Sequence, residues 1–181
     1  RSSITIPAPS REGAAEELSA ITTNLSSTYG KGKFEYKGQM INLDEASTII
    51  ETSRDPEELK AVWEGWRTVS PTYRETYQRF VELGNQGAKD SGFNDLADAW
   101  KSNYDMSPAN FTIEARRLWD QVKPFYDELH CHVRAKLGEQ YGEDKVPQDG
   151  PIPAHLLGNM WSQTWDNIYP IMEPHKGVAS L

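Results

Sequence analysis

Residues 107–141 read SPANFTIEARRLWDQVKPFYDELHCHVRAKLGEQY and form the longest segment with a helical pattern in the chain. Ser107 followed by Pro108 is typical of a helix start, because a serine side chain caps free N–H groups and proline fits the first turn. Apolar side chains then recur along the stretch at the three- and four-residue spacing of one helix face. Pro124 removes one backbone hydrogen bond, so we expect the helix to kink or divide there.

The rest of the chain is also predicted to be helical, with short loops between the helices. Ser10 and Asp44 are the expected caps of two of these helices. Short alternating runs around a Lys-Gly turn predict a small β-hairpin near residues 33–41. The expected fold class is therefore mainly α, with helices over residues 11–29, 44–53, 70–92, 94–104 and 154–169 and another that begins near Pro56.

Length and composition exclude several classes of protein. The chain has 181 residues, enough for one domain or little more. A net charge of −8 argues against a nucleic-acid surface, and no apolar run is long enough to span a membrane. The single cysteine, Cys131, allows neither an internal disulfide nor a cysteine-based zinc site. Because neither end carries a start or stop signal, we expect a chain that is incomplete at both ends.

Catalytic motifs are absent from the sequence. His130 and His132 are the only closely spaced histidines, and on a helix they point about 200° apart, so one metal ion cannot easily bind both. Packing or surface positions are the favoured interpretation of these two histidines. The His-Glu-x-x-His zinc motif, the Gly-x-Ser-x-Gly motif, the phosphate loop and the dinucleotide fingerprint are all missing. The sequence therefore predicts no metal ligands and no catalytic residues in this chain.

Two tryptophan-rich segments, residues 63–67 (WEGWR) and 161–165 (WSQTW), place polar groups between indole rings. One interpretation is core packing with polar tips. The other is a pocket wall, in which the Arg67 guanidinium holds an anion and the Gln163 amide donates to a carboxylate. The residues alone leave both interpretations open.

Residues 152–165 (IPAHLLGNMWSQTW) resemble the corresponding stretch of the angiotensin-converting enzyme family of zinc peptidyl-dipeptidases. The resemblance extends over essentially the whole chain. Animal members usually carry a cysteine pair where this chain has residues 34–40, and its absence favours a bacterial homologue. Further matching segments are TSR (52–54), VWEGWR (62–67), FVEL (80–83), VKPFY (122–126) and LHCHVRAKL (129–137).

The resemblance implies a helical, two-lobed enzyme that binds zinc and removes dipeptides from peptide C-termini. In the family, the His-Glu-x-x-His motif follows the region matched here. Residues 1–181 are thus expected to be a single helical segment, largely part of one lobe, and inactive alone. The implied partners are peptides with a free C-terminus and the rest of the same polypeptide, with a periplasmic or extracellular location. The alternative is a non-catalytic peptide-binding module or a pseudoenzyme remnant.

The resemblance also implies roles for four residues. Gln163 matches a glutamine that grips the C-terminal carboxylate of the substrate, and Thr164 stands beside it. Arg67 matches the arginine of one chloride site, and Tyr104 matches a tyrosine that lines another. The competing interpretations are a buried salt bridge for Arg67 and core packing for Tyr104.

Overall fold

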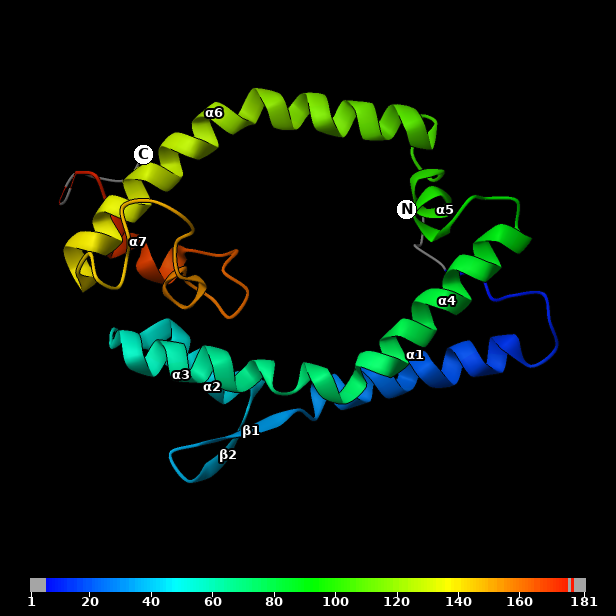
Figure 1. Cartoon of the computed structure of the whole chain (residues 1–181), viewed down its shortest axis with the longest axis horizontal. Coiled ribbons are helices and arrows are strands. Elements are labelled where there is room, and N and C mark those ends of the chain that lie inside the picture. The colour runs from blue at the N-terminus through cyan, green and yellow to red at the C-terminus, as the bar shows by residue number, and fades with distance from the viewer. Residues whose placement is uncertain (1–5, 176, 178–181) are drawn as a thin grey trace. The chain divides into compact units, whose positions relative to one another are not determined.

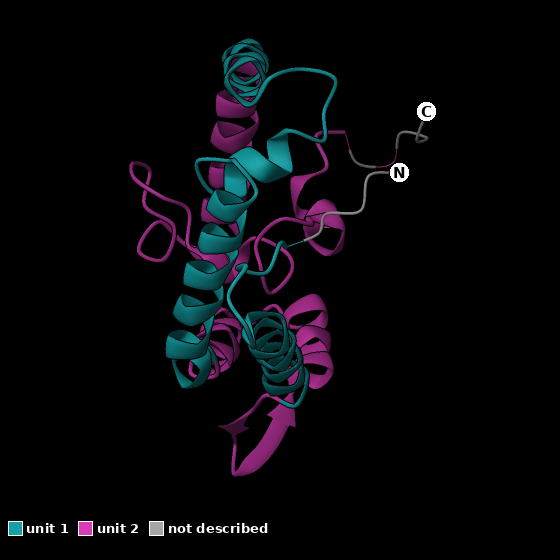
Figure 2. Cartoon of the chain, turned by 90° about the vertical axis from the view of Figure 1, so that its right-hand side faces the viewer, with its two compact units in different colours: residues 1–31, 70–122 teal, residues 32–69, 123–181 magenta. Residues whose placement is uncertain are grey.

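The computed structural model describes residues 6–175 and 177. Contacts divide the chain into two compact units (Figure 2). Unit 1 comprises residues 1–31 and 70–122, and unit 2 comprises residues 32–69 and 123–181. Helices dominate both units, and the described residues form a single two-stranded sheet (Figure 1). The mainly α fold class with one hairpin is therefore confirmed.

Unit 1 is built around two helices that pack against each other, α1 (Ala14–Gly30) and α4 (Arg74–Asp90). A 3-10 turn, η1 (Ser70–Tyr73), leads into α4, and α5 (Leu96–Lys101) packs against α4. The long helix α6 (Pro108–Tyr141) begins in this unit.

A glycine in α4 lets the entry segment of the chain lie directly on the helix. A Cβ at Gly87 would stand 1.9 Å from the carbonyl oxygen of Pro7. Ser10, predicted to cap the first helix, instead donates from its N–H and its hydroxyl to Asp90, at 2.7 and 2.9 Å. The predicted Ser10 cap is therefore wrong. Helix α1 begins directly after Gly13, and it is Gly13 that has a left-handed backbone conformation.

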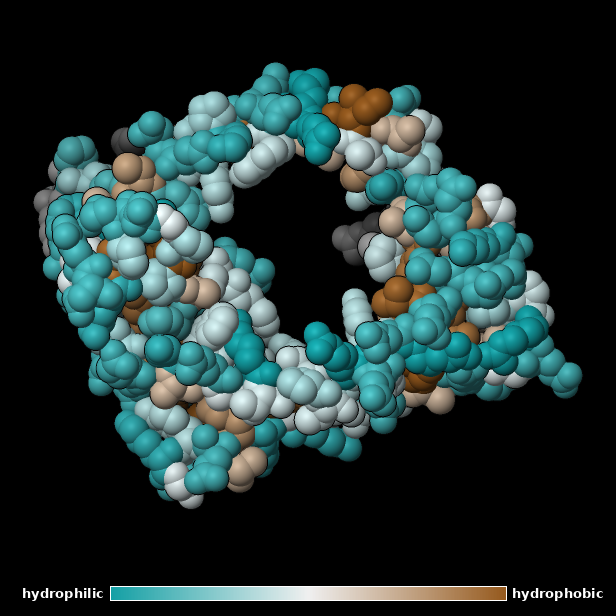
Figure 3. Space-filling model, in the orientation of Figure 1, coloured by the Kyte–Doolittle hydropathy of each residue, from teal (hydrophilic) through white to brown (hydrophobic). Residues whose placement is uncertain are grey.

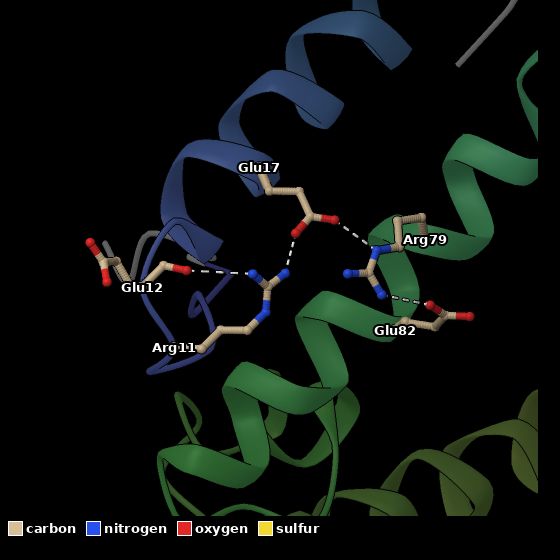
Figure 4. Close-up of polar contacts among 5 residues, drawn as sticks. All are labelled: Arg11, Glu12, Glu17, Arg79 and Glu82. Carbon is tan, nitrogen blue, oxygen red and sulfur yellow. Dashed lines mark hydrogen bonds and ion pairs between the residues drawn. The ribbon is translucent and has the colours of Figure 1, made fainter.

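Ion pairs on the surface of unit 1 join the entry segment, α1 and α4 (Figure 4). Glu17 accepts hydrogen bonds from Arg11 and, at 2.7 Å, from Nε of Arg79. Arg79 also donates to Glu82 at 3.0 Å. The two hydrogen bonds from Arg79 and Arg11 lower the pKa of Glu17, and the bond from Arg79 is the main cause.

Unit 2 begins with the predicted hairpin, β1 (Lys33–Tyr36) and β2 (Gln39–Asn42), in antiparallel register. Both turn residues, Lys37 and Gly38, have positive φ, as a tight two-residue hairpin turn requires. The buried Phe34 ring lies so close to Gly65 that a Cβ there would stand 2.3 Å from it. This contact docks the hairpin on the helix that contains Gly65.

The helices of unit 2 supply its core. After α2 (Leu43–Thr52) and α3 (Pro56–Arg67) come the later part of α6, two 3-10 turns, η2 (Ala154–Leu156) and η3 (Asp166–Ile168), and the short α7 (Tyr169–Met172). Polar residues cover most of the face drawn in Figure 3. Among the residues that the structure describes, the largest fully buried side chains all belong to this unit: Ile50, Leu137, Leu156, Met160, Val62, Val133 and Val146.

The predicted cap of α2 is wrong, and α6 is not divided. Helix α2 is capped by Asn42 and not by Asp44, because Asn42 and Glu45 form a reciprocal capping box at 2.9 and 2.8 Å. Asp44 lies in the first turn instead. Helix α6 continues through Pro124, so the helix does not divide there, and the alternative of a kink stays a prediction.

The helix predicted over residues 154–169 does not form. The segment consists of η2, an irregular loop and η3. Gly158 (φ 82°) and Ser162 (φ 60°) have left-handed backbone conformations that interrupt a right-handed helix. The apolar spacing that predicted the helix instead places Leu156, Met160 and Ile168 in the core.

Candidate functional site

The candidate site in unit 2 is the tryptophan loop, defined here as Gly158–Trp165, which joins η2 to η3. At its start, Gly158 has positive φ, and a Cβ there would stand 2.0 Å from the carbonyl oxygen of Thr164. Only glycine therefore allows the two ends of the loop to approach so closely.

Hydrogen bonds from asparagine side chains hold the tryptophan loop in place. Asn159 Oδ1 accepts the N–H groups of Trp161 and Gln163, both at 3.1 Å. Asn167, which follows the loop, donates its amide to the carbonyl oxygens of Gly158 at 3.4 Å and Ile50 at 3.3 Å. The second of these bonds ties the loop to α2.

Arg67 attaches the tryptophan loop to α3. Its guanidinium lies 3.6 Å from the ring centre of Trp63, a cation–π contact. One nitrogen donates to the carbonyl oxygen of Trp63 at 3.1 Å, and the other to that of Met160 at 2.6 Å. Met160 is fully buried, so Arg67 fixes the backbone of the loop three residues before Gln163.

Gln163 and Thr164 both lie exposed on the tryptophan loop. Among the described residues, the side-chain amide of Gln163 has no hydrogen-bond partner, so its N–H groups can donate to a ligand. Thr164 lines a polar pocket of about 280 Å³ that also involves Glu51 and Asp166. The structure thus brings three of the predicted site residues, Gln163, Thr164 and Arg67, to one loop and its anchor.

Tyr104 belongs to unit 1, whereas the other three predicted site residues belong to unit 2. It follows α5, is 57% exposed and stacks on Phe111 with ring centres 4.3 Å apart. Its packing is therefore peripheral and not part of the core.

The four tryptophans of the two predicted segments differ in their surroundings. Trp66 is buried in the core, and Trp63 lies beneath Arg67. Trp161 is 48% exposed, whereas Trp165 is half-buried and donates its indole N–H to Ser162 at 3.2 Å. Core packing thus accounts for Trp66, and the pocket-wall interpretation of the other tryptophans stays a prediction.

The two closely spaced histidines are packing residues. His130 lies against Tyr126 and Trp165, with ring centres 4.1 and 5.3 Å apart. Burial lowers its pKa, and Nε2 has no partner among the described residues. His132 Nε2 lies 2.8 Å from the carbonyl oxygen of Met172.

Zinc does not fit the residues present here. Within residues 6–175 and 177, no three His, Cys, Asp or Glu side chains are grouped to hold a metal ion. Residues 1–5, 176 and 178–181 contain none of these residue types.

Residues 6–175 and 177 contain no helix that is long and apolar enough to cross a bilayer.

Sequence reasoning missed two features of this unit. An apolar pocket of about 330 Å³ opens between α6 and α7, and its lining includes Leu129, Val133 and Trp165. It was missed because a helix was expected at residues 154–169. The hydrogen bonds of Asn159 were also missed, because a Gly-Asn pair signals a tight turn but not the bonds that the side chain then makes.

Comparison with known proteins places these features in a family. The angiotensin-converting enzyme family model, peptidase M2, matches residues 2–180. An angiotensin-converting enzyme of Theromyzon tessulatum is 39% identical over 173 residues, which cover 92% of this chain and 28% of that protein. Those of Rattus norvegicus and Sus scrofa are 37% and 39% identical, each over 92% of this chain and 13% of the relative. The chain thus spans between about an eighth and a little over a quarter of the length of these relatives.

The matched region includes the tryptophan loop, its anchor Arg67 and the exposed Gln163. The chain therefore belongs to the angiotensin-converting enzyme family.

Proposed function

We propose that this chain is part of a zinc-dependent peptidyl-dipeptidase, which removes dipeptides from the C-termini of peptides. In this proposal, residues 1–181 belong largely to one lobe, and the tryptophan loop forms a wall of the substrate cleft. Family membership supports the peptidase assignment. The observation that carries the role of this chain is the exposed amide of Gln163 on a loop fixed from both sides.

The chemistry of Gln163 suits a carboxylate. Its amide nitrogen carries two N–H donors, and a hydrogen bond to a charged acceptor is about twice as strong as one between neutral groups. Arg67 and Asn159 hold the surrounding backbone, so little backbone conformational entropy is lost when the amide engages a ligand, and the cost that remains is the ordering of the Gln163 side chain. Thr164 is proposed as a neighbouring support.

The remaining parts of the site are proposed to lie elsewhere in the polypeptide. Zinc would be held by residues outside this chain, and the 181 residues alone would not hydrolyse peptides. The chloride roles of Arg67 and Tyr104 stay predictions. A bacterial origin and a periplasmic or extracellular location are further proposals that rest on the resemblance.

The proposal is tested with the longer protein that contains this chain and a matched pair of peptides. One peptide ends in a free carboxylate, and the other has the same sequence with a C-terminal amide. We expect release of the C-terminal dipeptide from the first peptide and much slower cleavage of the second, with activity lost on zinc chelation and restored by zinc. Equal cleavage of both peptides would contradict the proposal. Binding without cleavage would favour a non-catalytic peptide-binding module.

A further inference from the structure

We propose that Asn159 is the positioning residue that sets the place of Gln163, and thereby the affinity for the substrate carboxylate. The inference rests on the proposed function of Gln163, but its structural part can be tested without any activity. Asn159 does not have to touch the substrate in this role, because it acts through the backbone of the tryptophan loop.

Asn159 is bonded to each of the four residues from Trp161 to Thr164. Its side-chain oxygen accepts from the N–H groups of Trp161 and Gln163, both at 3.1 Å. Its backbone carbonyl accepts from Ser162 N–H at 3.0 Å, and its own N–H donates to Thr164 O at 3.1 Å. One residue thus fixes the entire segment that carries the exposed amide.

The type of side chain matters at this position. The two bonds to Trp161 and Gln163 need a short side chain that ends in an sp² oxygen, which only asparagine and aspartate provide. Leucine has nearly the same shape but no acceptor. Aspartate keeps the acceptor and adds a negative charge next to the amide of Gln163.

The effect of these substitutions on two kinds of peptide distinguishes a positioning role of Asn159 from a general effect on the stability of the loop. A loop that is merely less stable would bind carboxylate and amide substrates equally poorly. Displacement of the Gln163 amide weakens only the contact to the free carboxylate. The effect should therefore appear in KM for peptides with a free C-terminus and not in kcat.

The structural test is hydrogen exchange of single amides in the 181-residue chain. In the unchanged chain, we expect Trp161 and Gln163 to exchange about tenfold more slowly than Thr164, whose N–H has no acceptor among the described residues. Asn159→Leu should abolish this difference in exchange rate, while the backbone amide of the core residue Leu137 stays protected. Asn159→Asp should retain it.

The functional test uses the same two variants of the longer protein and the pair of matched peptides. Asn159→Leu should raise KM about tenfold for the free-carboxylate peptide, with kcat and the amidated peptide little changed. Asn159→Asp should also raise KM for the free-carboxylate peptide, here through charge repulsion, and should do so less at higher ionic strength.

The outcomes distinguish the inference from the function on which it rests. Equal exchange of the Gln163 and Thr164 amides in the unchanged chain would overturn the positioning role, even if Asn159→Leu fails to fold. Slow exchange combined with an equal KM change for both peptides would also overturn it. If Gln163→Ala itself leaves KM unchanged while the exchange pattern is as expected, the fault lies with the proposed function and not with the loop geometry.

Discussion

At the scale of single residues, Glu58 shows how one carboxylate can fix a hairpin to a helix. It accepts hydrogen bonds from the Tyr36 hydroxyl at 2.6 Å, Lys37 Nζ at 2.8 Å and the Ser53 hydroxyl at 2.7 Å. These three bonds, the one from Lys37 first, lower the pKa of Glu58 to about 2. The charged carboxylate is therefore the form that the fold stabilises.

Replacing Glu58 with glutamine should destabilise unit 2 at neutral pH. Because the charge-assisted bonds are lost, we expect the free energy of unfolding in urea to fall by about 1–2 kcal/mol. The difference in unfolding free energy between the variant and the unchanged protein should narrow as the pH falls from 4.5 towards 2. The reason is that Glu58 takes up its proton at a higher pH in the unfolded chain than in the folded one. Glu57→Gln, which removes an exposed partner of Lys145, is the control and should have a smaller effect. Equal losses for both variants would contradict this account.

His130 should make unit 2 less stable in mild acid. Burial lowers its pKa below the ordinary 6.5, with Arg134 adding to the effect and Asp127 opposing it. The unfolded chain therefore takes up the proton more readily, and the free energy of unfolding falls as the pH drops below 6.5. His130→Phe keeps a ring beside Trp165 and should make this dependence shallower in urea titrations at several pH values.

Some pH dependence should remain in His130→Phe, because burial also lowers the pKa of His155. A slope that is unchanged between pH 7 and 5 would show that His130 does not titrate as inferred.

At the scale of elements, the tryptophan loop depends on a glycine that no other residue can replace. Gly158 and Gly150 both have positive φ, but only at Gly158 would a Cβ clash with backbone atoms. We expect Gly150→Ala to cost about 1 kcal/mol of unfolding free energy and Gly158→Ala about 3 kcal/mol or more. Similar costs for the two variants in urea unfolding would mean that the loop can open without penalty.

The sequence predicted the elements whose signals are local. The hairpin follows from its Lys-Gly turn, and the start of α6 at Pro108 follows from the Ser-Pro pair. The helix over 154–169 was wrongly predicted because core residues in an irregular loop happen to share helical spacing. What decides against the helix is the close approach of Gly158 to Thr164, a contact between backbone atoms that leaves no periodic trace.

The candidate site was predictable in part. Gln163 and Arg67 were singled out by the tryptophan-rich segments, and the resemblance then implied their roles; in the structure Gln163 lies on the tryptophan loop and Arg67 bonds to it from α3. The bond from Arg67 to the Met160 carbonyl and the bonds of Asn159 could not be foreseen, because they depend on how the loop turns. Tyr104 was expected at an anion site, and that role remains a prediction.

At the scale of the whole molecule, the chain covers only part of the length of its relatives. The purified 181-residue chain should retain well below one zinc ion per chain after dialysis, because a zinc site needs three or four protein ligands in one place. The longer protein should retain about one zinc ion per zinc site by the same metal analysis. Stoichiometric zinc in the 181-residue chain would contradict the proposed division of the site.

The KM of Gln163→Ala in the longer protein tests whether Gln163 contacts the substrate carboxylate. We expect KM to rise about tenfold for a peptide with a free C-terminus and to stay nearly unchanged for its amidated counterpart. Gln148→Ala removes the same kind of amide from a different loop of unit 2, where it donates to Glu143, and should leave both values unchanged. Equal KM changes of Gln163→Ala on both peptides, or none, would contradict the account.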